Sequence, residues 1–191
     1  EAANILIDPL TAANPSSLLN LTPVAVQALD VALNFDNGTA LNNRSGGTVG
    51  TDRIGALWLG DLHIGALGSG DPLEAGDVSF GTASDDGSAL YIDANQDGVF
   101  DSPGEMVVNN KDTHGRRERF GSINLAEGVY GMGIGFFERT GGENMEAVYM
   151  QGVAAAYTEM SFINPSDASQ LNLFSFETVP SGALSNTVTL N

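Results

Sequence analysis

Oxygen-bearing side chains recur at alternate positions in the stretch YIDANQDGVFDSPGE, residues 91–105. A calcium ion takes about six to eight oxygen ligands, and loops of the form D-x-N-x-D-G supply them from positions 1, 3 and 5, with glycine at position 6 for the sharp turn. Without a cation, groups crowded in this way repel one another. The alternative is a solvated acidic hairpin turn that holds no metal. We predict a calcium loop with these ligands: Asp93, Asn95, Asp97, the Val99 carbonyl, Asp101 and Glu105.

The last ligand position separates this loop from the helix-loop-helix calcium motif. That motif requires glutamate at position 12, where this chain has Gly104, and Glu105 comes one residue late. The flanking residues also alternate as strands do. We therefore expect a calcium loop at the tip of a β-hairpin.

A second acidic point, SDDGS, precedes a predicted strand and places Asp85 and Asp86 side by side. One interpretation is a turn in which the aspartates cap backbone N–H groups and Gly87 adopts a positive φ. The other is a second calcium site. The residues alone leave both interpretations open.

Composition limits the classes of partner. The chain has 191 residues, with 24 Asp or Glu against 7 Lys or Arg and a net charge of -17, which disfavours nucleic acids and anionic membranes and favours cations. The absence of cysteine excludes a disulfide framework, zinc-thiolate and iron-sulfur sites and a cysteine nucleophile. No apolar run approaches the ~20 residues of a membrane span, so we expect no membrane insertion.

Strand-type alternation, interrupted by glycine and aspartate, dominates the chain. Short strands at this spacing predict an all-β fold, an antiparallel two-sheet β-sandwich of jelly-roll-like form with extended N- and C-terminal arms. One short helix is predicted at 22–29, with Thr22 as its cap and Pro23 at its first position. The predicted strands are 29–35, 54–64, 77–83, 89–92, 105–109, 121–126, 129–138 and 145–154, with further alternating runs at 171–176 and 186–190.

Three regions follow from this pattern. Residues 1–49 form an N-terminal arm suited to donating a strand, residues 50–157 form the sandwich, and residues 158–191 form a strand-rich tail. Asn20, Asn37 and Asn43 lie in glycosylation-type triplets, but a chain so rich in Asn, Ser and Thr contains such triplets by chance.

The stretches ASDDGSALYID (83–93) and MVVNNKDTHGRRERFGSINLAEGVYGMGIGFFERTGGENMEAVY (106–149) resemble the protective-antigen-type domain. This β-sandwich is shared by anthrax protective antigen, yeast flocculins, bacterial adhesins and some glycoside hydrolases. The similar elements occur in the family's order and cover roughly residues 50–155. The family's aromatic opening strand is missing, and the 93–105 loop and the tail are additions.

The resemblance implies a site. In the family's lectin members a cis peptide joins the adjacent aspartates, which hold a calcium ion that binds sugar hydroxyls. Carried over, the aspartates are Asp85 and Asp86, and the loop RTGGEN adds further oxygens, with Asn144 as the best side-chain candidate.

Catalysis is not expected. We interpret His63 and His114 as structural, and no G-x-S-x-G, H-E-x-x-H or phosphate-loop pattern occurs. Three arginines, at positions 116, 117 and 119, could bind an acidic glycan, but we favour pairing with local carboxylates such as Asp112 and Glu118.

Two functions fit these observations. The first is a secreted, calcium-binding structural subunit of a filament or surface layer, which associates with copies of itself by strand donation from its arms to an open sheet edge. The alternative is a calcium-dependent carbohydrate-binding module, a lectin or adhesin, that recognises cell-surface glycans. Under both we expect an extracellular or cell-surface location, with a signal peptide already removed.

Overall fold

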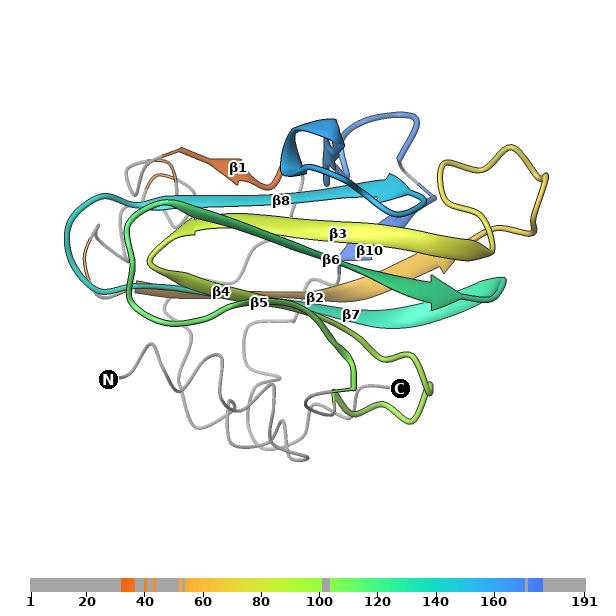
Figure 1. Cartoon of the computed structure of the whole chain (residues 1–191), viewed down its shortest axis with the longest axis horizontal. Coiled ribbons are helices and arrows are strands. Elements are labelled where there is room, and N and C mark those ends of the chain that lie inside the picture. The colour runs from red at the N-terminus through yellow and green to blue at the C-terminus, as the bar shows by residue number, and fades with distance from the viewer. Residues whose placement is uncertain are drawn as a thin grey trace.

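The computed structural model describes residues 32–36, 40, 43, 52, 54–100, 104–170 and 172–176. The elements in these residues are β1 (Asn34–Phe35), β2 (Ile54–Ile64), β3 (Gly76–Asp85), β4 (Gly87–Ile92), β5 (Met106–Asn110), β6 (Arg117–Leu125), β7 (Gly128–Glu138), β8 (Asn144–Gln151), η2 (Tyr157–Glu159), β9 (Ser161–Phe162) and β10 (Phe174–Phe176). The strands form two antiparallel sheets packed face to face (Figure 1), which confirms the predicted sandwich. The β8 sheet has the order β1-β8-β3-β6, with β9 also paired to β8, and the β7 sheet has the order β10-β2-β7-β4-β5.

Side chains at every second strand position fill the space between the sheets. In β7 these are Met132, Ile134 and Phe136, which are fully buried. Val78 and Phe80 of β3 belong to the same core cluster and are also fully buried. Because successive side chains of a strand point to opposite faces, this alternation in the sequence fixes which face of each sheet is covered.

The other face of β7 carries glycines, and they leave room for an aromatic ring. A Cβ at Gly133 would lie 3.0 Å from the ring of Phe100, and Phe100 packs with the buried Tyr91 and Phe137. The backbone N–H of Asp93 donates to the Gly131 carbonyl at 2.9 Å. The acidic stretch that follows β4 therefore folds back over the outer face of its own sheet.

Most predicted strands agree with the structure to within two residues, and β2 agrees at both ends. Two differ more. The strand predicted at 121–126 begins earlier, at Arg117, because residues 117–119 pair in register with residues 82–84 of β3. The β8 strand ends at Gln151 rather than at 154, because Gly152 has a φ of 88°. The sequence analysis did not predict η2 or β9.

The described parts of both arms add strands to this sandwich. Residues 34–35 pair with β8 and residues 174–176 pair with β2, so these two sheet edges are used within the chain. The expected helix at 22–29, the strand at 186–190, Asn20 and Asn37 lie outside the described residues. None of the described residues belongs to a helix with the length and apolar character needed to cross a membrane.

Gly87, between the acidic pair and β4, provides a test of the packing. A Cβ at this position would lie 2.3 Å from the Phe137 ring and 2.8 Å from the Asp112 carbonyl. We expect Gly87→Ala to lower the free energy of unfolding by roughly 1 to 3 kcal/mol through overpacking, measured by urea denaturation. Gly104→Ala is the control, because no atom of the described residues beyond its chain neighbours lies within 4 Å of its Cβ position. Equal stability of the two variants would contradict this account.

Candidate metal centre

Four strand ends meet at one end of the sandwich and bring acidic side chains together. The ligand oxygens of Asp85, Asp86 and Glu138 lie within 4.8 Å of one another, the only such group found among the described residues. Asn144 stands opposite Asp85 in the β3–β8 register, so both lie on the same face of the β8 sheet. The Asp85–Asp86 peptide is cis, as the family resemblance implies.

Asp86 is anchored by backbone N–H groups from two loops. Its Oδ1 accepts from the N–H of His114 and its Oδ2 from the N–H of Arg139, each at 2.9 Å. Only 4% of the residue is exposed. Gly87 is not among the positive-φ residues, so the turn interpretation with a left-handed glycine is wrong, although Asp86 does cap backbone groups.

A polar network beneath the cluster holds the loop that carries His114. The Asn110 side chain donates to the Ser84 hydroxyl at 3.0 Å and to the Arg117 carbonyl at 2.9 Å, and it accepts from Arg117 Nε at 2.8 Å. The two ring nitrogens of His114 face the carbonyls of Gly115 and Asn110 at 2.8 and 3.0 Å. The ring is held between these two backbone carbonyls. We therefore describe His114 as a residue that orders the backbone.

Glu138 is the site residue that the sequence analysis did not identify. It is fully buried. The backbone N–H of Asp86 partly offsets its charge, but no contact from a described residue reaches hydrogen-bond geometry. Burial, together with the negative charges of Asp86 and Asp85, raises the pKa of Glu138 to about 7. The only signal in the sequence is a carboxylate at the end of the predicted strand 129–138; its proximity to the aspartates follows from the pairing of β4 with β7.

Asn144 and Asp85 complete the cluster. The Asn144 Oδ1 is buried and has no partner among the described residues, whereas its Nδ2 donates to Glu146 at 3.1 Å. Burial and the adjacent charge of Asp86 raise the pKa of Asp85, which is partly exposed. A Cβ at Gly142 would lie 3.1 Å from the Asp85 carboxylate, so the 139–143 hairpin passes close over the site.

These donors fit a hard divalent cation. Calcium prefers carboxylate and amide oxygens, and buried polar atoms without partners are rare in native proteins. Here the orphaned atoms, Glu138 Oε1 and Oε2 and Asn144 Oδ1, belong to residues in or beside the carboxylate group. Asp85, Asp86, Glu138 and Asn144 would hold the ion.

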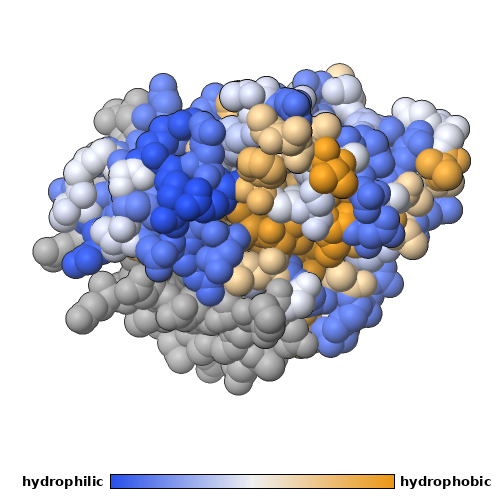
Figure 2. Space-filling model, in the orientation of Figure 1, coloured by the Kyte–Doolittle hydropathy of each residue, from blue (hydrophilic) through white to orange (hydrophobic). Residues whose placement is uncertain are grey.

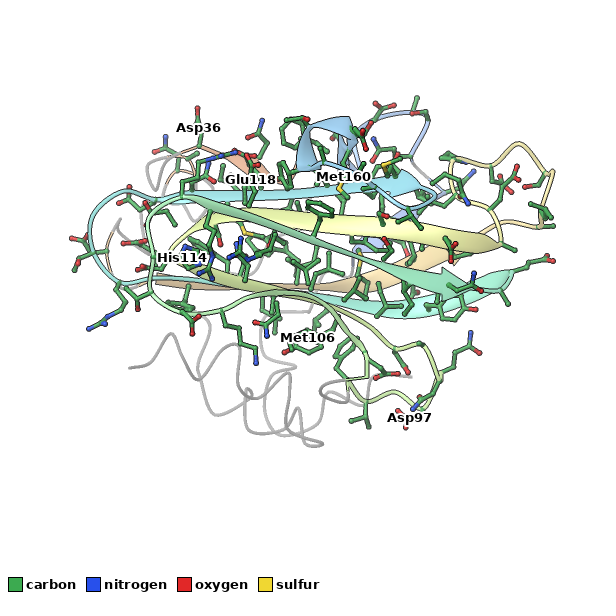
Figure 3. All side chains as sticks on the ribbon, in the orientation of Figure 1. Asp36, Asp97, Met106, His114, Glu118 and Met160 are labelled. Carbon is green, nitrogen blue, oxygen red and sulfur yellow. The ribbon has the colours of Figure 1, made fainter. Side chains whose placement is uncertain are left out.

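The predicted calcium loop at 93–105 lies at the opposite end, as the labels of His114 and Asp97 show in Figure 3. Asp93 accepts backbone N–H groups from Asp97 and Gly98 at 3.1 and 2.9 Å, and Asp97 accepts from Val99 at 2.9 Å. Asn95 donates its backbone N–H to Glu105 at 3.2 Å.

Metal binding by this loop stays a prediction. The described carboxylates of Asp93, Asp97 and Glu105 do not gather as the first group does. Asp101 lies outside the described residues.

Of the three arginines predicted to pair with local carboxylates, Arg116 and Arg117 do so in the described part of the chain. Arg116 contacts Glu118 and Glu146, each at 2.9 Å. Arg117 reaches Asp112 only at 4.0 Å. Arg119 donates to the backbone carbonyl of Glu118 at 3.0 Å.

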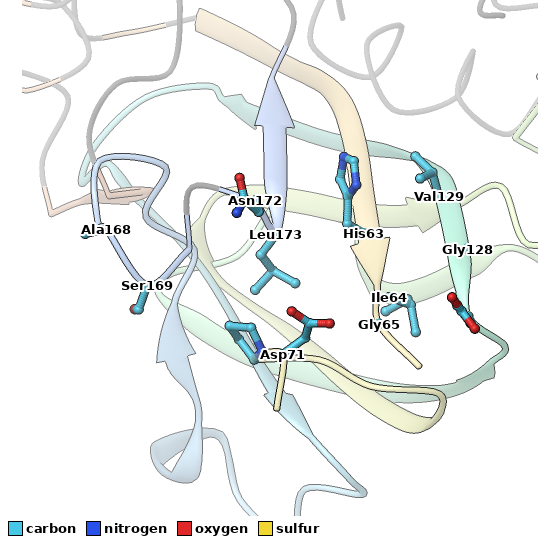
Figure 4. Close-up of a pocket in the computed structure, with 12 residues that line it drawn as sticks. His63, Ile64, Gly65, Asp71, Gly128, Val129, Ala168, Ser169, Asn172 and Leu173 are labelled. Atoms are coloured by element: carbon cyan, nitrogen blue, oxygen red, sulfur yellow. The ribbon is translucent and has the colours of Figure 1, made fainter. Parts of the chain in front are cut away.

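The other histidine, His63, lines a cleft of about 460 Å³ where β2 ends and β7 begins. Figure 4 shows the carboxylate of Asp71 pointing between Leu173 and Ile64 in this cleft. Because the cleft lies at the start of β7 and Glu138 at its end, His63 is remote from the carboxylate group.

Comparisons with known proteins identify related folds. No family model matches the chain, and no curated protein does. Among solved structures, an anti-sigma factor domain-containing protein is similar at a TM-score of 0.50 with 17% identity, over 71% of this chain and 39% of that one. This likeness supports the sandwich fold alone, and the chain spans 39% of that protein.

Two further similar structures carry the PA14 name. They are a PA14 sugar-binding domain from an RTX adhesin (TM-score 0.48, 15% identity, 76% of this chain and 74% of that one) and the PA14 domain of the antifreeze protein MpAFP (TM-score 0.48, 17% identity, 80% and 75%). They are compatible with the family resemblance but carry no argument at this similarity. The relation to anthrax protective antigen itself stays a prediction.

The raised pKa of Glu138 predicts a pH dependence of stability in calcium-free buffer. Between the ordinary value of 4.5 and about 7 the folded chain keeps a proton that the unfolded chain has released, so stability falls as pH rises through this window. We expect wild type to lose roughly 1 to 3 kcal/mol more than Glu138→Gln between pH 5 and pH 8, measured by urea denaturation. Calcium at pH 8 restores the loss in wild type only. Parallel pH profiles of the two proteins would refute the assignment.

Calcium stoichiometry tests the 93–105 loop separately. If both acidic regions bind, calorimetry of wild type gives two ions per chain and Asp97→Asn gives one. Asp71→Asn, in the cleft away from the predicted ligands, is the control and leaves the number unchanged. A single ion per wild-type chain that Asp86→Asn removes would exclude the loop as a calcium site.

Proposed function

We propose that this chain is a calcium-dependent glycan-binding module of an extracellular or cell-surface protein. The observation that carries the proposal is the convergence of three carboxylates within 4.8 Å, with the buried, unpartnered oxygens of Glu138 and Asn144 in the same region. Such a donor set is costly without a cation. The family resemblance, through its lectin members, supports the extension from cation to sugar.

The buried and the partly exposed residues of this site would have different roles in binding the ion. Asp86 and Glu138, both buried, would hold the ion from below, and Asp86 stays in place through its two backbone N–H donors. Asp85 is partly exposed, so this side of the site opens to solvent. The bound ion would supply the remaining coordination positions to paired sugar hydroxyls.

The exposed surroundings suit a neutral ligand. Residues 139–142 are exposed and pass over Asp85, so this hairpin would contact the sugar. The surface at this end of the molecule is hydrophilic (Figure 2). With a net charge of -17 and Arg116 already paired to Glu118 and Glu146, an acidic glycan finds little electrostatic attraction here.

Binding rather than catalysis is the role that we propose. In the described part of the cluster, His114 offers a backbone N–H to Asp86, and both of its ring nitrogens face backbone carbonyls. This imidazole has no lone pair directed at the site, so it is poorly placed for proton transfer.

Self-association through the arms stays a prediction. The described arm strands β1 and β10 pair with β8 and β2 of the same chain, so those residues are used internally.

Glycan binding is tested on an array of neutral and acidic glycans, with calcium and with excess chelator. We expect binding to neutral glycans that chelator abolishes, and Asp86→Ala to lose it by at least tenfold because the ion loses an anchored ligand. Glu127→Gln is the matched control, since Glu127 is exposed and lines the remote cleft. Glycan binding that persists in chelator would overturn the proposal, as would a folded, calcium-loaded chain that binds no glycan.

A further inference from the structure

The side-chain amide of Asn144 has one end bound and the other free. Its Nδ2 donates to Glu146 Oε1 at 3.1 Å, while the buried Oδ1 has no partner among the described residues. The contact with Glu146 identifies the nitrogen of this amide, because a carboxylate needs a donor opposite it. Rotating the amide by half a turn would place Oδ1 against a carboxylate, which only accepts.

Glu146 is itself held by donors on several sides. Arg116 Nη2 donates to both of its oxygens, at 3.1 and 2.9 Å, and the Tyr157 hydroxyl donates to Oε2 at 3.3 Å. The carboxylate side chain is 12% exposed. Each oxygen of Glu146 therefore has at least two donors, and its position leaves little freedom to Asn144.

The donors are fixed as well. The ring of Tyr157 packs on β3, where a Cβ at Gly81 would lie 3.0 Å from it. Burial and the charge of Glu146 raise the pKa of Tyr157, so the hydroxyl keeps the proton that it donates. Arg116 contacts Glu118 on its other side at 2.9 Å. These contacts form a clamp made of Arg116, Glu146 and Tyr157.

We propose that Glu146, fixed by Arg116 and Tyr157, is a positioning residue that holds the Asn144 amide with Oδ1 presented to the cation. This inference rests on the proposed calcium site and extends it. Glu146 does not belong to the carboxylate group found among the described residues, and its charge is balanced by Arg116. It acts through Asn144 and is not a ligand, so the site has three carboxylates and one neutral oxygen donor from side chains.

A double-mutant cycle on the full chain separates this role from direct ligation and from general destabilisation. Calcium affinity is measured by calorimetry for wild type, Asn144→Ala, Glu146→Ala and the double variant. We expect Glu146→Ala to weaken calcium binding by roughly tenfold, as outer partners of metal ligands do. The double variant is expected to bind as Asn144→Ala does, because Glu146 has no other route to the ion.

Two further variants serve as a conservative replacement and as a control. Glu146→Gln retains an oxygen that accepts from Asn144 and is expected to recover affinity to within about threefold of wild type. Glu127→Gln, in the remote cleft, changes a carboxylate that contacts no member of the clamp, and is expected to leave calcium affinity unchanged. Additive losses in the cycle, or wild-type affinity in Glu146→Ala, would overturn the clamp.

A measurement on the wild-type chain keeps the inference testable if Glu146→Ala does not fold. Side-chain NMR of the calcium-free protein is expected to show the Asn144 amide protons protected from exchange relative to those of the exposed Asn109. Adding calcium should shift the Asn144 carbonyl carbon and leave the protection in place. Equal exchange at the two residues would overturn the clamp. A wild-type chain that binds no calcium overturns the proposed function, whatever the amide shows.

Discussion

Negative charge gathered in a poorly solvated place is the constraint on which the rest of this molecule depends. Asp85, Asp86 and Glu138 bring their oxygens within 4.8 Å of one another, with two of the three residues buried. Burial, together with the negative charges of Asp86 and Asp85, raises the pKa of Glu138 to about 7. Backbone N–H donors compensate Asp86. Glu138 receives no contact of hydrogen-bond geometry from the described residues, and the backbone N–H of Asp86 offsets its charge only in part, so a cation is the natural counterpart.

The sandwich supplies this cluster from both of its layers. In the β8 sheet, Asp85 is the last residue of β3 and Asn144 is the first residue of β8. In the β7 sheet, Glu138 is the last residue of β7, and Asp86 joins β3 to β4. A bound ion would therefore tie the two sheets together at one end. The buried side chain of Asn110 holds the 111–116 loop from the same side. The same hydrogen bonds therefore position both the proposed ligands and this loop.

The chain handles its second acidic stretch in a different way. Around Asp93 and Asp97, carboxylates accept N–H groups of their own loop, and Phe100 is packed over the glycines of β7. Local hydrogen bonds thus offset part of the repulsion there, which the cluster at the other end cannot achieve with its own donors.

The outer face of the β8 sheet differs from both acidic regions because it carries apolar side chains. Apolar colour gathers over its middle (Figure 2), and Phe120 of β6 and Phe162 of β9 are exposed.

The sequence by itself determined the all-β class and most strand positions, whereas the grouping of Asp85, Asp86 and Asn144 was implied by the family resemblance. Strand alternation is a local signal of period two, and two adjacent aspartates can be read directly from the sequence. Tertiary structure decided what depends on pairing. Register with β3 made the charged run 117–119 a strand, and pairing of β4 with β7 carried Glu138 to the aspartates. The clamp of Glu146 by Arg116 and Tyr157 also joins three separate segments. No local pattern encodes such contacts, because they arise only when strands distant in sequence are brought side by side.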